Sequence, residues 1–335
     1  TRAADIAEPL ADLLARHSGP LSLPMLSSLT SPALARRLLA DGRTDFSRVR
    51  VASPAVEELF ARSPSGLDLR GLTTLHTEPL AARLLAAGRV DFAAVTTFSE
   101  AALGPLAIHK GVLHLEGLAA AARTQSAISD RLAACLARHA GPLELDQLTS
   151  LTDEAAESLA THQGDLSLDS ITKLSPAAAK AFAAHRGRLG LNGLRWISPL
   201  VEESLASHRG GLSLDGLETL ASADLARTLT AEGRREFGRL EELFPPAAAV
   251  LAGLDGTLFL NGLESLTPET AAKLATHAGD LSLNGLRTIP EAVALALSRH
   301  RGDLSLAGLV DPPPPVLQAL SRHAGPVFTA RPAVP

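Results

Sequence analysis

Hydrophobic residues recur along this chain with a period of 23 residues. The stretch from Leu143 to Gly211 shows three consecutive copies, LELDQLTSLTDEAAESLATHQGD, LSLDSITKLSPAAAKAFAAHRGR and LGLNGLRWISPLVEESLASHRGG. Each copy has apolar residues at positions 1, 3, 6 and 9, an Ala-rich amphipathic run, a His at position 20 and a Gly at position 22. Self-similarity at a fixed period of this length predicts a repeat solenoid, in which each repeat packs against its neighbours.

Within one repeat, the pattern predicts a strand, a corner and a helix. Alternation at positions 1 and 3 predicts a short strand with one buried face. A pair such as Asn192-Gly193 at positions 4 and 5 turns the chain. Thr or Ser at position 10, often followed by Pro as in Ser175-Pro176, predicts the N-cap of a helix whose positions 13, 17 and 20 face inward. We interpret the Gly at position 22 as a left-handed residue that ends the helix.

Thirteen full repeats make up most of the chain. They begin at Leu21, Thr44, Leu67, Val90, Leu113, Leu143, Leu166, Leu189, Leu212, Arg235, Leu258, Leu281 and Leu304, with steps of 23 residues except for one of 30 after Leu113. We predict a single solenoid domain over residues 1–335. Its parts are a partial N-terminal repeat helix (1–20), four repeats (21–112), an irregular repeat with an insertion (113–142), eight repeats (143–326), and a terminal strand and tail (327–335).

Three repeats depart from the pattern in the same way. The shifted repeats, which begin at Leu21, Leu67 and Leu212, move their helix leucines by one position and end in LADGR, LAAGR and TAEGR, without the His. The leucines concerned are Leu34/Leu38, Leu80/Leu84 and Leu225/Leu229, and the repeat that follows has an acidic residue and then Phe in Asp45-Phe46, Asp91-Phe92 and Glu236-Phe237. A shift of one residue rotates a helix by about 100°. We hypothesise that the larger Phe fills the gap that this rotation leaves.

The LxLxxLxxL pattern of strand and corner, with an outer helix and a 23-residue period, resembles bacterial leucine-rich-repeat proteins over residues 10–329. The resemblance implies an α/β right-handed repeat solenoid, with a parallel β-sheet on one face and short α-helices on the other, and protein recognition as its usual role. One feature departs from the family pattern. Position 6 is aliphatic, as in Ile171, where the family has a buried Asn or Cys. The hydrogen-bond ladder that this Asn provides must therefore be made in another way.

Bulk composition narrows the class of protein only slightly. A hydrophobic content of 46% is sufficient for a continuous core, and a net charge of −5 without a basic block argues against a nucleic-acid partner. No apolar run approaches the roughly 18 residues of a membrane-spanning helix, so no membrane insertion is expected. No signal peptide is apparent, and the chain begins at Thr1, so a processed N-terminus and the compartment stay open. Cys135 is the single cysteine, which excludes an intrachain disulfide and a Cys-based metal motif.

A column of histidines at position 20 has two interpretations. Its members are His17, His109, His139, His162, His185, His208, His277, His300 and His323. They could form a metal-binding or pH-sensing ladder. We favour a structural role, in which each ring binds carbonyls at the helix end and packs inward, because no carboxylate or thiol recurs in register to complete a tetrahedral metal site. The sign of any pH effect stays open, since burial and the helix dipole shift the pKa of histidine in opposite directions.

No motif of a known catalytic site is present. The sequence contains no GxSxG elbow, Walker loop or HExxH helix, and Ser, His and Asp recur only because the repeat recurs. We therefore predict a protein that is not an enzyme and has no cofactor and no metal. The favoured function is a non-catalytic protein–protein interaction or scaffold module. The alternative is a structural spacer, or a subunit that self-associates end to end through uncapped solenoid ends.

The outward strand positions are the predicted contact surface. In the first repeats they form a weakly acidic patch for a basic partner, against the alternative of an ordinary solvated sheet surface. Phe259 is the single aromatic residue at position 2 of a complete repeat, and Trp196 lies in a strand-to-helix corner. Aromatic residues are enriched among those that contribute most to binding. The candidate protein-contact residues are Asp45, Asp68, Asp91, His114, Glu144, Trp196 and Phe259.

Overall fold

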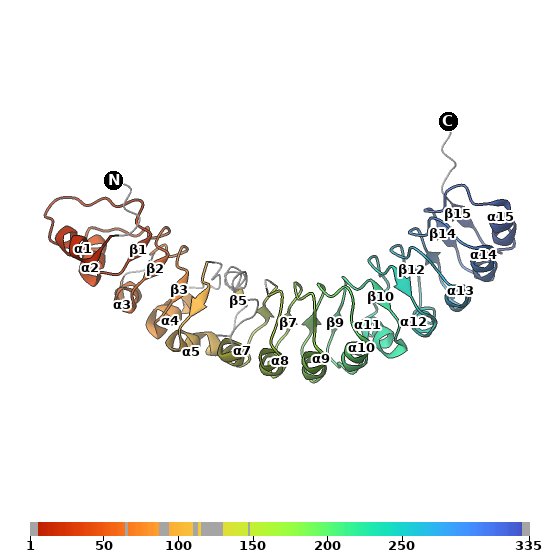
Figure 1. The fold of residues 1–335 in the computed structure, drawn as a ribbon, viewed down its shortest axis with the longest axis horizontal. Helices are drawn as coiled ribbons and strands as arrows, with labels where there is room; N and C mark the ends of the chain where they lie inside the picture. Colours follow the sequence, from red (N-terminus) through yellow and green to blue (C-terminus); the bar gives the residue numbers. More distant parts are fainter. Residues whose placement is uncertain are drawn as a thin grey trace, which may run out of the picture. The chain divides into compact units, whose positions relative to one another are not determined.

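A computed structural model describes residues 6–63, 66–86, 94–109, 113–114, 130–146 and 148–329. The chain divides into two compact halves, Thr1–Leu168 and Asp169–Pro335. In each half, short α-helices alternate with short parallel strands, and the helices line one side and the strands the other (Figure 1). This arrangement confirms the predicted α/β repeat fold. The single domain over residues 1–335 stays a prediction, and most of the predicted insertion, residues 115–129, lies outside the described residues.

The first half contains three groups of paired strands. Its helices are α1 (Glu8–Ala15), α2 (Pro32–Ala40), α3 (Pro54–Arg62), α4 (Glu78–Ala86), α5 (Glu100–Ile108), α7 (Asp130–Leu136) and α8 (Asp153–Ala160). Its strands are β1 (Ser28–Leu29), β2 (Val51–Ala52), β3 (Thr74–Leu75), β4 (Thr97–Phe98), β5 (Leu113–His114), β6 (Leu143–Glu144) and β7 (Leu166–Ser167). Parallel pairing joins β1 to β2, β3 to β4, and β5 to β6 to β7.

The second half is built in the same way. Its helices are α9 (Pro176–Ala183), α10 (Pro199–Ala206), α11 (Ala223–Thr230), α12 (Pro245–Leu251), α13 (Pro268–Leu274), α14 (Glu291–Leu297) and α15 (Pro314–Leu320). Its strands are β8 (Leu189–Gly190), β9 (Leu212–Ser213), β10 (Thr219–Leu220), β11 (Glu242–Leu243), β12 (Leu258–Phe259), β13 (Leu281–Ser282), β14 (Leu304–Leu306) and β15 (Val327–Thr329). Parallel pairing joins β8 to β9, β10 to β11, and β12 to β13 to β14 to β15.

The helices begin and pack as the pattern predicts. In α8, the Thr152 side chain at position 10 accepts a hydrogen bond of 3.0 Å from the main-chain N–H of Ala155, which is the geometry of an N-cap. Ala155, Ala156 and Leu159 are all fully buried. Positions 13, 14 and 17 therefore form the inward face of the helix, and His162 at position 20 is buried as well.

Strands pair at two different places in the repeat. Most strands lie at positions 1 and 2, as predicted, but β1 to β4, β10 and β11 lie at positions 8 and 9. This second ladder joins each shifted repeat to the Phe-containing repeat that follows it, as in the register Thr219↔Glu242. Positions 8 and 9 are only two residues, which is too few for an alternation of polar and apolar side chains to indicate a strand. The sequence pattern therefore predicts the first ladder and misses the second.

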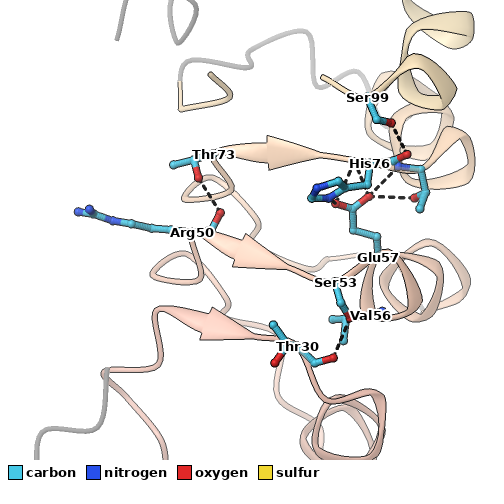
Figure 2. A network of polar contacts seen from close by, with 9 residues as sticks. Thr30, Arg50, Ser53, Val56, Glu57, Thr73, His76 and Ser99 are labelled. Atoms are coloured by element: carbon cyan, nitrogen blue, oxygen red, sulfur yellow. Dashed lines mark hydrogen bonds and ion pairs between the residues drawn. The ribbon is translucent and has the colours of Figure 1, made fainter. Parts of the chain in front are cut away.

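A buried glutamate accompanies the shift of the helix. In the shifted repeats the N-cap lies at position 11 instead of 10, as with Ser222 before α11, so the helix begins one residue later. Glu57, from the preceding helix α3, is fully buried and accepts hydrogen bonds from the main-chain N–H groups of His76 (2.9 Å) and Thr77 (2.8 Å), where α4 begins (Figure 2). Glu202 does the same before α11. These two carboxylates satisfy N–H groups that the displaced helix leaves without intrahelical partners.

The inward leucines of the shifted helices are mostly those predicted. Leu34, Leu38, Leu225 and Leu229 are buried. In α4, Leu80 is buried as well, but Leu84 is only half-buried and Leu85 takes the second inward place.

Position 4 provides the side-chain ladder that the aliphatic position 6 cannot make. In the second half, Asn192 Oδ1 accepts hydrogen bonds from the Ser213 hydroxyl (2.8 Å) and from the main-chain N–H of Asp215 (2.8 Å) in the next repeat. Asn261 and Asn284 make the equivalent bonds. The Asn side chains therefore link successive repeats at the corner after the strand.

The glycine at position 22 has the predicted left-handed conformation in shifted repeats but not after His208. Gly42 and Gly233, which end shifted repeats, have left-handed φ values of 77° and 82°. Gly210, which follows His208, does not have a positive φ. A Cβ on Gly210 would instead collide with the carbonyl oxygen of Gly187 and lie 2.8 Å from His208 Nε2. Close approach of the neighbouring repeat, and not a left-handed turn, therefore requires glycine there.

We predict that Glu57→Ala lowers the free energy of unfolding by about 3 kcal/mol, because it leaves buried main-chain N–H groups without acceptors. Glu58→Ala is the matched control on the same helix. The Glu58 side chain is exposed and forms an ion pair with Arg62 at 3.5 Å, so its loss should change stability by less than about 0.5 kcal/mol. Urea unfolding followed by circular dichroism measures both, and equal effects of the two variants would contradict the proposed role of Glu57.

The Phe residues after the shifted repeats should also contribute to stability. Phe46 is fully buried with its ring centroid 4.9 Å from that of Phe60, and Phe237 is also buried. We expect Phe46→Leu and Phe237→Leu each to lower the unfolding free energy by about 1.5 kcal/mol, with Phe244→Leu, at an exposed side chain, as a nearly neutral control. Neutrality of both buried variants in thermal denaturation would refute the gap-filling hypothesis. Phe92 lies outside the described residues.

Candidate functional site

The strand face is defined by the side chains at position 2 of the repeats. Leu143 in β6 and Leu145 directly after it are buried, whereas Glu144 between them is exposed. Neighbouring residues of a strand point to opposite sides of the sheet, so positions 1 and 3 supply the core and position 2 points outward. The strand face therefore displays side chains that the core does not use.

In the first half, the acidic candidates lie beside arginines. Asp45 and Asp68 form an isolated parallel β-bridge and are neighbours on the strand face. The Asp68 carboxylate pairs with the Arg70 guanidinium at 2.6 Å. Hydrogen bonds from the hydroxyl and main-chain N–H of Ser47 lower the pKa of Asp45 below its ordinary value. The charge of this patch is thus partly compensated within the chain.

The remaining candidates of the first half are less fully described. His114 in β5 is in register with Glu144 in β6. Asp91 lies outside the described residues. The proposal that this acidic patch contacts a basic partner stays a prediction.

In the second half, the aromatic candidates lie at two different places in the repeat. Trp196, at position 8 between β8 and α10, has 70% of its surface exposed. Phe259 lies at position 2 in β12, on the strand face, and is 37% exposed. The register of the four-stranded sheet places Phe259, Ser282, Ser305 and Phe328 in one row across β12 to β15. Phe328 is also exposed, so the row has an aromatic side chain at each end and two small hydroxyl residues between them.

A charged hollow lies where a shifted repeat meets its successor in the second half. It has a volume of about 590 Å³ and is lined by Arg188, Leu212, Ser213, Asp215, Leu229, Glu232, Gly233, Arg234, Glu236, Gly238 and Arg239. The repeats on its two sides pair through β10 and β11, at positions 8 and 9, and no pairing is described between β9 and Glu236 at positions 1 to 3. The absence of the first ladder leaves the hollow open.

Arg234 spans this junction. Its Nε donates a hydrogen bond of 3.0 Å to the carbonyl oxygen of Glu236, and its guanidinium lies 4.8 Å from the centroid of the Phe237 ring. In an ordinary junction the equivalent carbonyl, that of Ser213, accepts from the main-chain N–H of Leu191 at 2.9 Å. The arginine side chain therefore replaces a bond of the missing ladder, and its stacking on the ring adds a cation–π contact.

Arg43 makes the same arrangement in the first half, with one difference. Its Nε donates to the Asp45 carbonyl at 2.8 Å, its guanidinium lies 5.1 Å from the Phe46 centroid, and its Nη1 donates to the Leu23 carbonyl at 3.0 Å. In Arg234, Nη2 pairs with Asp215 Oδ1 at 2.8 Å, and the buried Nη1 has no hydrogen-bond partner among the described residues. Burial lowers the pKa of both guanidinium groups below the ordinary value, and a nearby carboxylate opposes this shift.

Sequence reasoning did not select the residues of the hollow. The signal was present in the recurrent Gly-Arg-x-acid-Phe pattern of residues 42–46 and 233–237. Its chemical meaning depends on contacts between repeats, which the pattern alone does not show.

The histidines of position 20 form stacks between repeats. The ring centroids of His185 and His208 are 6.0 Å apart, and those of His277 and His300 are 6.2 Å apart. His208 Nδ1 lies 3.1 Å from the carbonyl oxygen of Phe182, at the end of the preceding helix. The rings thus pack inward, as favoured, but the carbonyl that His208 binds belongs to the neighbouring helix and not to its own.

Within the described ranges, no three His, Cys, Asp or Glu side chains come together in an arrangement that could hold a metal ion. None of the helices in this part of the chain combines the length and the apolar character that crossing a bilayer requires.

Comparison with known proteins finds structural likenesses and no matching family model. No protein-family model matches the chain, and no curated protein matches it. Among solved structures, the chain is similar to an internalin from Listeria monocytogenes, with 12% sequence identity over 74% of this chain and 83% of that one, and a TM-score of 0.29. The likeness assigns no function, so the function of this chain has to be argued from its own residues.

The histidine stacks predict a decrease in stability in acid. Burial lowers the pKa of His300 below its ordinary value, and the charges of His323 and His277 lower it further. Such a histidine binds fewer protons in the folded chain than in the unfolded chain. Its contribution is therefore complete above the unfolded pKa of about 6.5, and stability is lost as the pH falls below it, by about 1.4 kcal/mol for each unit of pKa difference.

We expect the urea concentration at the unfolding midpoint to decrease when the pH is lowered from about 7.5 to about 5. His300→Asn should reduce this pH dependence, while His17→Asn, at an exposed side chain, should leave it unchanged. A midpoint that rises towards acid pH, or an identical slope in all three proteins, would show that the histidine stacks do not cause the effect.

Proposed function

We propose that this chain is a non-catalytic protein-interaction module that binds its partner through the strand face. The observation that carries this proposal is the row of Phe259, Ser282, Ser305 and Phe328 across β12 to β15. Adjacent strands lie about 4.8 Å apart, so three steps separate the two Phe residues by roughly 14 Å. The small serines between them leave a shallow floor on which a partner can rest between two aromatic side chains.

The physical chemistry of this row supports binding rather than a structural role. Phe328 is 53% exposed, and neither Phe328 nor Phe259 is among the buried residues of the core. Exposed aromatic side chains gain free energy when a partner removes them from water, and aromatic residues are enriched at the centres of protein interfaces. The core is built by positions 1, 3, 13, 14 and 17, and the hydroxyls of Ser282 and Ser305 at position 2 bond to Asn261 and Asn284. The two exposed Phe side chains of the row make no such bonds and are available for recognition.

Site-specific photo-crosslinking tests this proposal. The photoreactive residue p-benzoylphenylalanine is placed at position 259 or 328, and at position 295 as the control. Leu295 lies on helix α14 with the same exposed fraction as Phe259, 37%. In an extract of cells that make the protein, we expect one discrete heterologous product from positions 259 and 328 and none from position 295, as measured by gel shift and mass spectrometry.

The outcomes separate the two functional classes. If Phe328→Ser abolishes the product formed from position 259, both aromatic residues belong to one binding surface. If all three probes give the same products, the strand face has no special role and the proposal fails. Products that contain only copies of this chain, together with a mass that grows with concentration in light scattering, would support the alternative of a self-associating structural subunit.

A further inference from the structure

We propose that the charged hollow between the repeats that begin at Leu212 and Arg235 binds an extended acidic peptide segment of a partner protein. The peptide's carboxylate would pair with Arg234 and Arg239, and its main chain would lie along β9. The inference rests on the proposed function, since it assumes a protein partner, but it concerns a site distinct from the row of Phe259 and Phe328.

The size and lining of the hollow fit a peptide. Its volume of about 590 Å³ lies within the range of about 300–1,000 Å³ that is typical of ligand sites. Leu212 and Leu229 supply apolar surface, and charged side chains supply the polar groups that orient a ligand. This combination suits a segment in which apolar and charged side chains alternate.

The guanidinium of Arg234 requires an acceptor. Its Nη1 is buried and has no hydrogen-bond partner in the described part of the chain, whereas the equivalent atom of Arg43 donates to the Leu23 carbonyl at 3.0 Å. A buried donor without a partner is costly, and more so when the group is charged. The second junction thus repeats the first, except that this buried donor has no acceptor among the described residues.

The balance of charges favours a carboxylate over a dianion. The hollow is lined by three arginines and by the carboxylates of Asp215, Glu232 and Glu236. Two of the arginines are paired within the chain, Arg234 with Asp215 at 2.8 Å and Arg188 with Glu232 at 3.8 Å. The three carboxylates repel a doubly charged group such as phosphate. A singly charged carboxylate meets less repulsion when it pairs with the exposed Arg239 and with the part of the Arg234 side chain that lines the hollow.

The main chain of β9 favours an extended segment. Gly211 and Ser213 accept the ladder bonds from the preceding repeat, from Leu189 N (2.7 Å) and Leu191 N (2.9 Å). Polar groups of alternate residues in a strand face opposite sides, so the N–H groups of Leu212 and Leu214 face the hollow. No strand pairing with the next repeat is described for β9. An extended peptide can therefore add to this edge as a further strand, with main-chain bonds for affinity and its carboxylate for specificity.

Fluorescence anisotropy with labelled peptides tests the inference on the full chain. The probes are pools of acetylated, amidated pentapeptides with Val, Ile or Leu at positions 2 and 4 and with Glu, Gln or Lys at the centre. We expect the Glu pool to bind at least about tenfold more tightly than the Gln pool, because a charged hydrogen-bonded pair discriminates by that factor or more. The Lys pool should bind less tightly than the Glu pool.

Variants locate the binding to the hollow. Arg234→Gln should remove the preference for Glu over Gln, whereas Arg43→Gln, at the matched junction of the first half, should leave it intact. Arg239→Gln should reduce the preference as well, and because Arg239 is exposed this variant tests the site even if Arg234→Gln fails to fold. Circular dichroism and thermal unfolding verify the fold of each variant.

Several results would overturn the inference. These are equal binding of the Glu and Gln pools, or a Glu preference that survives undiminished in Arg239→Gln or in a folded Arg234→Gln. Displacement of the Glu pool by an equal concentration of sodium acetate would show that the site recognises a free carboxylate and not a peptide. The proposed function is tested separately by the crosslinks from position 259. If these crosslinks persist in Arg234→Gln while peptide binding to the hollow is refuted, the proposed function stands and only the inference about the hollow is wrong.

Discussion

Successive repeats of this chain approach one another closely enough to share main-chain hydrogen bonds, and this contact restricts the rest of the repeat. A Cβ on Gly193 would lie 2.6 Å from the carbonyl oxygens of Asp169 and Ile171, so any other residue at this site would force the two repeats to shift. The neighbouring Asn192 uses the same closeness to bond to the next repeat. The leucines at positions 1 and 3 point into the core only while this register holds, because a slip of one residue would turn them outward.

The shifted repeats show how the chain keeps this contact when one helix moves. In two of the shifted repeats the helix begins one residue later, and the main-chain N–H groups just before it bond to a buried glutamate. Glu57 is the acceptor before α4, and Glu202 is the acceptor before α11. The first shifted repeat follows α1, which has Ala11 at the equivalent place, so the glutamate is not part of every shift. The strand pairing then moves from positions 1 and 2 to positions 8 and 9. The position-2 carbonyl of the next repeat, that of Asp45 or Glu236, accepts a hydrogen bond from an arginine side chain in place of a main-chain N–H. A helix start that moves by one residue is thus accompanied by changes at several other positions of the repeat.

The sequence predicts the repeated parts of this structure well and the exceptions less well. A pattern that recurs thirteen times identifies the capped helix, the strand at position 1 and the buried Leu159 without further information. The left-handed φ predicted for position 22 is wrong at Gly210. A glycine at a helix end can be required by a left-handed φ or by a close neighbour, and only the contact with Gly187 distinguishes the two. The repeat pattern puts Asp45 and Asp68 on one face, but the pairing of Asp68 with Arg70 depends on side-chain geometry. Arg234 belongs to the recurring Gly-Arg pattern, but the buried Nη1 without an acceptor among the described residues is a property of the junction and not of the repeat.

The strand face and the hollow differ in how they are connected to the fold. Phe259 points away from the core, so its side chain can change without affecting the ladder behind it. In the hollow, the groups that would face the proposed ligand also hold the junction, since Arg234 stacks on Phe237, donates to the Glu236 carbonyl and pairs with Asp215. A ligand there therefore alters the environment of the junction, whereas a ligand on the strand face does not. Because β10 and β11 join the same two repeats independently, the hollow can be filled while the repeats stay in register.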